Sequence, residues 1–114
     1  VQVMKRDEVL DKAKEIIGGP RAEEYGDSFE NFTRILEGWN IIVNEAHKHQ
    51  GYITTRHVAL MMIWLKMARL LNSLDSEDSW MDIAGYAALG AECCENEADI
   101  EKRLDIFNGK RQKR

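Results

Sequence analysis

The sequence predicts an all-α protein, a bundle of four to five helices that forms one domain over residues 1–114. Three observations favour this class. Apolar residues recur at helical spacing along most of the chain, and the alternation typical of strands is missing. The chain has a single proline, the residue that interrupts helices. Hydrophobic residues make up 44% and charged residues 32%, a balance that supports one packed core beneath a solvated surface.

The helical pattern begins over about residues 6–17, and Gly18, Gly19 and Pro20 end it. The apolar face of this first helix carries Val9, Leu10, Ala13, Ile16 and Ile17. A second helix is predicted to begin near Asp27 or Ser28, because either side chain can cap free backbone N–H groups. Gly51 is expected to end it or the loop that follows. The core residues expected from this helix are Phe29, Phe32, Ile35, Leu36, Trp39, Ile42, Val43 and Ala46.

A third helix, over 58–71 with a cap at Thr54 or Thr55, is apolar nearly all round and is therefore expected to be central. A short polar connection over 74–77 predicts that a fourth helix, over 78–95, folds back as an antiparallel neighbour. Small residues on the fourth helix would let a neighbour approach closely; they are Ala84, Gly85, Ala87, Ala88, Gly90 and Ala91. A last helix over 98–107, capped by Asn108 and Gly109, should precede a basic, frayed tail at 110–114.

Charge and composition restrict the classes of partner. The net charge of −4 provides no field that would make nucleic acid the main partner. The longest apolar run, residues 58–65, is too short to span a bilayer, and residues 1–14 hold no secretory signal. We therefore expect a cytoplasmic protein without a membrane partner. Cys93 and Cys94 are adjacent and are expected to be reduced thiols.

Motifs for several common chemistries are missing. The histidines at 47, 49 and 57 do not have the spacing of a ligand set. The chain also lacks the glycine-rich phosphate loop, the dinucleotide fingerprint and the serine-hydrolase elbow. Any phosphate chemistry would therefore have to depend on carboxylates and a metal.

Charged residues of the third and fourth helices come level when these helices fold back on each other. Asp78, Asp82 and Tyr86 recur every four residues on one stripe, and Lys66 and Arg69 are neighbours on the third helix. Lys66 then lies level with Asp82, and Arg69 with Asp78. Two explanations stay open: ion pairs that fix the register of the helices, or acids that bind a metal beside cations that contact phosphate.

A second polar cluster precedes and opens the second helix. One continuous face of that helix carries Asp27, Glu30, Asn31 and Arg34. This face lies opposite the apolar stripe, so solvent exposure is its simplest explanation. Just before it, Gly26 suits a turn with positive φ, and Tyr25 can stack on a base or cover the edge of the core.

Three segments carry a family resemblance. They are Arg21-Ala-Glu-Glu-Tyr-Gly-Asp27, Ala59-Leu-Met-Met-Ile-Trp-Leu-Lys-Met-Ala-Arg69 and Asp78-Ser-Trp-Met-Asp-Ile-Ala-Gly-Tyr-Ala-Ala88. Over about 21–92 the chain resembles a family of small, uncharacterised helical proteins encoded mainly by phages and prophages. More distantly, it is similar to the all-α nucleoside triphosphate pyrophosphatases, the superfamily of MazG and the dimeric dUTPases.

The distant resemblance implies an activity. Those enzymes use acidic residues from two helices to bind Mg²⁺ and to cleave between the α- and β-phosphates. Glu30 and Asp82 can stand in two of those positions, whereas a Glu-x-x-Glu partner and the Glu-x-x-Asp pair are absent from this chain. Lys66 and Arg69 then suit a site that holds an anionic nucleotide, with or without cutting it.

The leading hypothesis is therefore a phage-type nucleotide-handling protein, which the resemblance extends to a Mg²⁺-dependent pyrophosphohydrolase. Its catalytic and metal-binding residues are Glu30, Asp78 and Asp82, with Asp27 as a further metal ligand, and its nucleotide-binding residues are Arg21, Tyr25, Asn31, Lys66, Arg69 and Tyr86. Two alternatives are a non-catalytic protein that sequesters a nucleotide or a cyclic dinucleotide, and a helical interaction module. A homo-oligomer is expected in all three cases, because the fourth helix has small residues and the third is so apolar.

Overall fold

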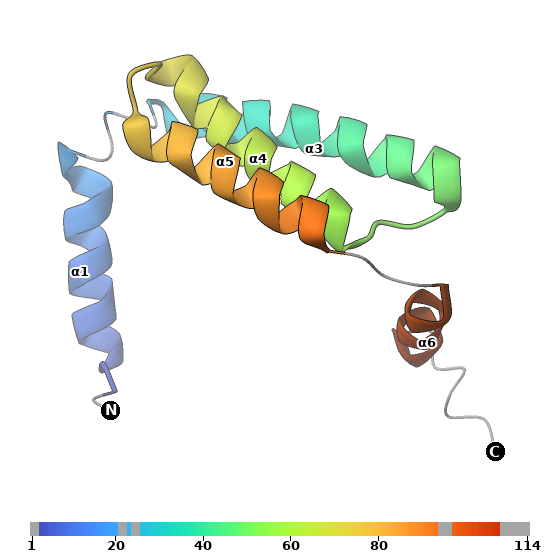
Figure 1. Ribbon diagram of the computed structural model, residues 1–114. Helices are drawn as coiled ribbons and strands as arrows, with labels where there is room; N and C mark the ends of the chain where they lie inside the picture. Colours follow the sequence, from blue (N-terminus) through green and yellow to red (C-terminus); the bar gives the residue numbers. More distant parts are fainter. Residues whose placement is uncertain (1–2, 21–22, 24–25, 94–96, 108–114) are drawn as a thin grey trace.

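The computed structural model describes residues 3–20, 23, 26–93 and 97–107. Its helices follow in the order α1 (Arg6–Gly18), α3 (Ser28–Gln50), α4 (Thr55–Asn72), α5 (Glu77–Glu92) and α6 (Glu97–Phe107) (Figure 1). These residues contain no strand, so the all-α prediction is confirmed. Within the same residues, no helix combines the length and the apolar character needed to cross a membrane.

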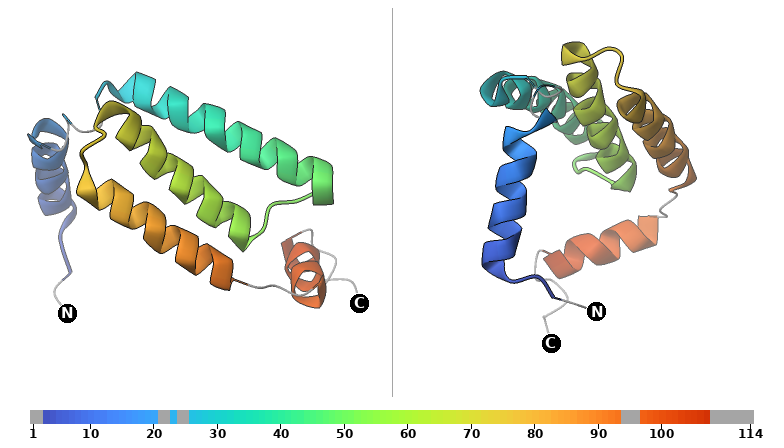
Figure 2. Two further views of the ribbon diagram at one scale, coloured as in Figure 1. Left: turned by 45° about the horizontal axis from the view of Figure 1, so that its top comes forward. Right: turned by 90° about the vertical axis from the view of Figure 1, so that its left-hand side faces the viewer.

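The packed part of the molecule is a layer of three helices with α4 in the middle (Figure 2). α4 packs against α3 on one flank and against α5 on the other. α1 and α6 lie away from the layer, near opposite ends of it (Figures 1 and 2). The central position of α4 follows from its composition, since a helix that is apolar nearly all round can bury two flanks at once. The predictions of a central third helix and of an antiparallel hairpin with the next helix are confirmed.

The ends of α3 and α4 are set by local hydrogen bonds. The Asp27 side chain accepts from the backbone N–H of Glu30 at 3.1 Å, which satisfies one of the free donors at the start of α3. Gly51 ends α3 with a φ of 87°, a conformation that favours glycine. Thr54 precedes α4, and its backbone N–H donates to Nδ1 of His57 at 3.0 Å. Each of these boundaries agrees with the sequence prediction.

Two tryptophans join α3 to α4 through backbone carbonyls. Trp39 of α3 donates its indole N–H to the carbonyl of Met61 at 2.7 Å. In the opposite direction, Trp64 of α4 donates to the carbonyl of Arg34 at 2.8 Å. The Trp64 indole lies directly against Gly38, where any Cβ would overlap it. The absence of a side chain at Gly38 therefore makes room for this contact.

The α4–α5 contact uses small residues and one arginine. A Cβ on Gly90 would lie 2.6 Å from that of Ala59, so only glycine permits this approach, whereas Gly85 faces open space. Arg56 of α4 donates to the carbonyls of Cys93 and Ala91 at 2.8 and 3.0 Å. These bonds satisfy carbonyls that the end of α5 leaves without an intrahelical partner. The predicted close approach of a neighbour to the fourth helix is confirmed at Gly90.

Several apolar residues predicted to be in the core are exposed. α1 has no buried residue, and on α3 the exposed set comprises Phe29, Phe32, Leu36 and Val43. The buried apolar residues are Ile35, Ala46, Ala68 and Leu70. The physical reason is the single layer, because each outer helix is covered only on the flank that meets α4. These predictions were wrong for the described chain taken by itself.

Candidate functional site

A cavity of about 340 Å³ lies between α3 and the second half of α4, and the end of α1 contributes one residue to its lining. It is lined by Ile17, Gly26, Ser28, Asn31, Phe32, Ile35, Leu65 and Arg69. One part of this lining is apolar, and the other carries an amide, a hydroxyl and a guanidinium. This combination of apolar walls with a few polar groups is typical of small-molecule sites. We call this cavity the α3–α4 pocket.

Asn31 is the most unusual residue of the α3–α4 pocket. Asn31 is only 6% exposed, and its Oδ1 atom is buried with no hydrogen-bond partner in the described part of the chain. A buried acceptor without a donor costs about 1–3 kcal/mol. The prediction that Asn31 lies on a solvent-exposed face was wrong. Asn31, Ile35 and Gly38 follow one another along α3 at helical spacing, and this line faces α4.

Arg69 supplies the positive charge of the α3–α4 pocket. It comes from the last turn of α4, where a cation also interacts favourably with the helix dipole. Its planar guanidinium carries five N–H donors. It can therefore bind a ligand while keeping the contact that it makes within the chain.

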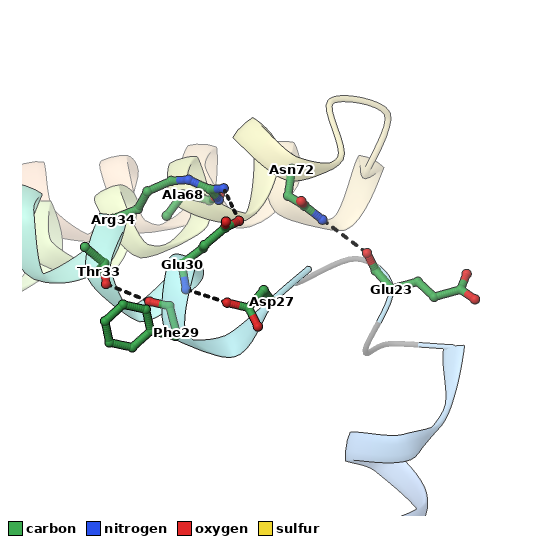
Figure 3. A network of polar contacts seen from close by, with 8 residues as sticks. All are labelled: Glu23, Asp27, Phe29, Glu30, Thr33, Arg34, Ala68 and Asn72. Atoms are coloured by element: carbon green, nitrogen blue, oxygen red, sulfur yellow. Dashed lines mark hydrogen bonds and ion pairs between the residues drawn. The ribbon is translucent and has the colours of Figure 1, made fainter.

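The segment before α3 is held against the end of α4 by a close contact (Figure 3). The Asn72 amide donates to the backbone carbonyl of Glu23 at 3.1 Å. Gly26 has a φ of 70°, and a Cβ there would lie 2.6 Å from Oδ1 of Asn72. The positive φ favours glycine at this position, and any other residue would also displace the Asn72 side chain.

The acids at the start of α3 serve that helix (Figure 3). Asp27 caps α3 through the Glu30 N–H, as described above. Glu30 lies 3.9 Å from the Arg34 guanidinium, and Arg34 also donates to the carbonyl of Ala68 across the α3–α4 contact at 3.4 Å. These contacts explain both acids without a metal.

Lys66 and Asp82 form an ion pair between α4 and α5, with 3.0 Å between Nζ and Oδ2. The sequence predicted this level pairing from the hairpin, and the prediction is confirmed. Lys66 is mostly buried and Asp82 is about half exposed. Asp78 is exposed in the first turn of α5, and its predicted pairing with Arg69 stays a prediction.

Within the described residues, no group of three or more histidine, cysteine, aspartate or glutamate side chains is arranged to hold a metal ion. Glu30 pairs with Arg34 and Asp82 with Lys66, so these two of the acids expected to form a Mg²⁺ cage are engaged elsewhere. One copy of the chain, over its described part, does not fit such a cage.

The remaining predicted site residues are divided between other places. Arg21 and Tyr25 lie outside the described residues. Tyr86 lines a different cavity, of about 410 Å³, between α4 and α5, together with Leu60 and Ile63. Its ring is half-buried against α4, whereas Asp78 and Asp82 of the predicted stripe are exposed. Tyr86 is therefore not a lining residue of the α3–α4 pocket.

Two contacts that hold the helices together could not be predicted from the sequence. Nothing in the sequence marks Gly38, because a glycine inside a helical pattern does not reveal which neighbour it meets. Arg56 at the start of α4 was missed because its partners are backbone carbonyls 35 and 37 residues further along the chain. Carbonyl partners of this kind leave no pattern in the side-chain sequence.

Comparisons with known proteins find similar proteins in two phages. It is 43% identical over 81 residues to the Gene 55 protein of Mycobacterium phage L5, covering 71% of this chain and 49% of that protein. It is 32% identical over 99 residues to the Gene 55 protein of Mycobacterium phage D29, covering 83% and 59%. The chain thus spans about half the length of the curated relatives it matches. No solved structure matches it significantly. Residues 8–94 match the model of a family described as a domain of unknown function, DUF6378, and the chain belongs to this family.

Proposed function

We propose that this chain is a nucleotide-handling protein that binds a phosphate-bearing nucleotide in the α3–α4 pocket. The observation that carries the proposal is the unpartnered Oδ1 of Asn31 beside an apolar cavity that also presents Arg69. A nucleobase has ring or exocyclic N–H groups that can donate to an amide oxygen. A phosphate accepts from a guanidinium in charge-assisted hydrogen bonds.

The size and walls of the α3–α4 pocket suit such a ligand. A volume of about 340 Å³ falls at the lower end of the range for small-molecule sites, which is about 300–1,000 Å³. Phe32, Ile35 and Leu65 provide apolar contact for the faces of a base or sugar. Lys66, three residues before Arg69 on α4, is paired with Asp82 of α5 and does not line the pocket, so Arg69 is the lining residue that would bind the phosphate.

Binding without hydrolysis is the form of this function that the geometry supports best. The distant similarity to all-α pyrophosphatases supplies the substrate class of the proposal, but in one described chain the acids that it assigns to Mg²⁺ are separated and engaged. A sequestering protein needs the pocket alone. Hydrolysis needs in addition a carboxylate cage that another part of an assembly would have to complete.

A thermal-shift screen tests the proposal. The chain is mixed with nucleoside triphosphates, monophosphates and cyclic dinucleotides, each with and without Mg²⁺, and every stabilising mixture is analysed by chromatography. A ligand at 100 times its Kd stabilises the folded state by about 2.7 kcal/mol, which raises the Tm of a domain of this size by on the order of 10 °C. Recovery of the intact ligand indicates sequestration, and release of pyrophosphate indicates hydrolysis.

Three variants locate the site. Arg69→Met and Asn31→Leu should each remove most of the shift, because one loses the phosphate contact and the other loses the acceptor. Lys48→Met, a matched loss of one exposed positive charge at the far end of α3, should keep it. The proposal is abandoned if no nucleotide shifts the wild-type Tm, or if both pocket variants respond like the wild type.

A further inference from the structure

The chain exposes far more surface than a monomer of its size. Its accessible surface is 9397 Å², whereas a compact monomer of 13.2 kDa is expected to expose about 6,400 Å². The excess reflects the single helical layer and the helices that lie off it (Figure 2). Obligate homodimers bury about 2,000–5,000 Å² in total, so the excess on each chain is large enough to supply one side of such an interface.

One apolar stripe on α3 stands out within this surface. Phe29, Phe32 and Leu36 are 78%, 66% and 57% exposed, and Val43 continues their line toward the end of the helix. The intervals of three, four and seven residues place all of them on one helix face. This face is distinct from the line through Asn31, Ile35 and Gly38 that meets α4. We call it the α3 stripe.

We propose that the α3 stripe is the interface with a second copy of this chain, paired antiparallel about a two-fold axis beside Leu36. Phe29 and Val43 lie equally far from Leu36 along the sequence, so this axis places Phe29 of one copy opposite Val43 of the other. Such a surface is self-complementary, as an isologous interface requires. The apolar groups of each copy then cover those of its partner.

The helix dipole of α3 fits the same antiparallel arrangement. A helix carries a partial positive charge at its N-terminus and a partial negative charge at its C-terminus. An antiparallel partner places the N-terminus of each α3 beside the C-terminus of the other, so the two dipoles attract. A parallel arrangement would place like ends together.

The α3 stripe also borders the α3–α4 pocket. Phe32 lines the pocket and is two-thirds exposed. A second copy on the stripe therefore covers the outer edge of the pocket and contributes to its wall. The interface itself needs no ligand, so it stands or falls independently of nucleotide binding.

Sedimentation velocity of the full chain tests the interface. The wild type should sediment as a dimer or a higher even-numbered assembly. Leu36→Asp should reduce the mass of the assembly at least twofold, because it places a charge at the centre of the stripe. Circular dichroism should show an unchanged helix content. Ile41→Asp is the matched control, since Ile41 is exposed to a similar extent as Leu36, 65% against 57%, but lies on a different face of α3. It should leave the assembly intact.

A cross-link fixes the pairing even if Leu36→Asp fails to fold. Phe29→Cys and Val43→Cys are introduced together into a chain with Cys93→Ser and Cys94→Ser. The two new thiols of one copy are about 21 Å apart along the helix, too far for a disulfide within the chain. Mild oxidation should therefore give a covalent dimer. A monomeric wild type, equal effects of Leu36→Asp and Ile41→Asp, or no covalent dimer on oxidation would each overturn the proposal.

Discussion

The two flanks of α4 are packed in different ways. Against α5, the contact closes at Gly90 and Ala59, and its charged groups are paired in the Lys66–Asp82 ion pair and the Arg56 hydrogen bonds. Against α3, two indole hydrogen bonds hold the middle of the contact, but one end contains a cavity and an amide oxygen without a partner. The α5 flank therefore has the features of a structural contact, and the α3 flank combines a structural half with a half suited to a ligand.

The largest expected effect concerns the structural half of the α3 flank. Gly38→Ala places a methyl group within the Trp64 indole and displaces it from the Arg34 carbonyl. We expect a loss of about 3 kcal/mol in the free energy of unfolding, measured by urea denaturation. Gly85→Ala is the control, since its methyl group meets open space and should stabilise α5 by up to about 1 kcal/mol. Equal effects of the two substitutions would contradict the assigned role of Gly38.

A smaller loss is expected on the α5 flank. Gly90→Ala brings two methyl groups within 2.6 Å, so α5 must shift away from α4. The free energy of unfolding should fall by about 1–3 kcal/mol. Combining it with Ala59→Gly removes the overlap and should restore most of the loss, which a double-mutant cycle measures. If the double variant is less stable than either single variant, overlap between positions 59 and 90 does not cause the loss of stability.

Asn31→Leu is expected to change stability in the opposite direction. Replacing a buried amide whose Oδ1 has no partner with an apolar side chain of similar size should stabilise the ligand-free chain by about 1–2 kcal/mol. The same variant should lose the nucleotide-dependent Tm shift. Stabilisation together with loss of binding would show that Asn31 is maintained for a ligand. A destabilised variant would mean that the amide has a structural partner.

The smallest effect is expected at the ion pair. Asp82→Asn should cost less than about 1 kcal/mol, because the acid is half exposed and solvent screens the pair. Lys66→Met should cost no more, since the remaining acid reaches water. Both values come from the same urea denaturation curves. A loss above about 2 kcal/mol for either variant would indicate that the pair fixes the register of the hairpin.

The sequence predicted the helices better than the surfaces they bury. Caps at Asp27, Thr54 and Gly51 depend on neighbours within a few residues, so local patterns contain the information. The Lys66–Asp82 pair was also predictable, because a short connection fixes the register of the hairpin. The burial of Asn31 depends instead on how far α3 rotates against α4, and no local pattern specifies that rotation.

The same limit applies to the candidate site. Asn31 and Arg69 were expected to contact a ligand, and the structure places both in one pocket. Tyr86 was expected beside Asp78 and Asp82 from their four-residue spacing, but a drift of about 40° at each step carries the tyrosine toward α4. The sequence predicts all the apolar residues of α3 to be core, because periodicity cannot distinguish an apolar face that the same chain covers from one that stays exposed on that chain.

The order of the packed helices has a consequence for the speed of folding. α3, α4 and α5 are consecutive in the sequence, and each packs against the next. Few contacts therefore join distant parts of the chain, and helical proteins with such low contact order fold in microseconds to milliseconds. Four-residue connections at 51–54 and at 73–76 join both helix pairs, so loop closure favours the α3–α4 and the α4–α5 hairpins equally. Association between copies, which depends on concentration, would then follow as the slower step.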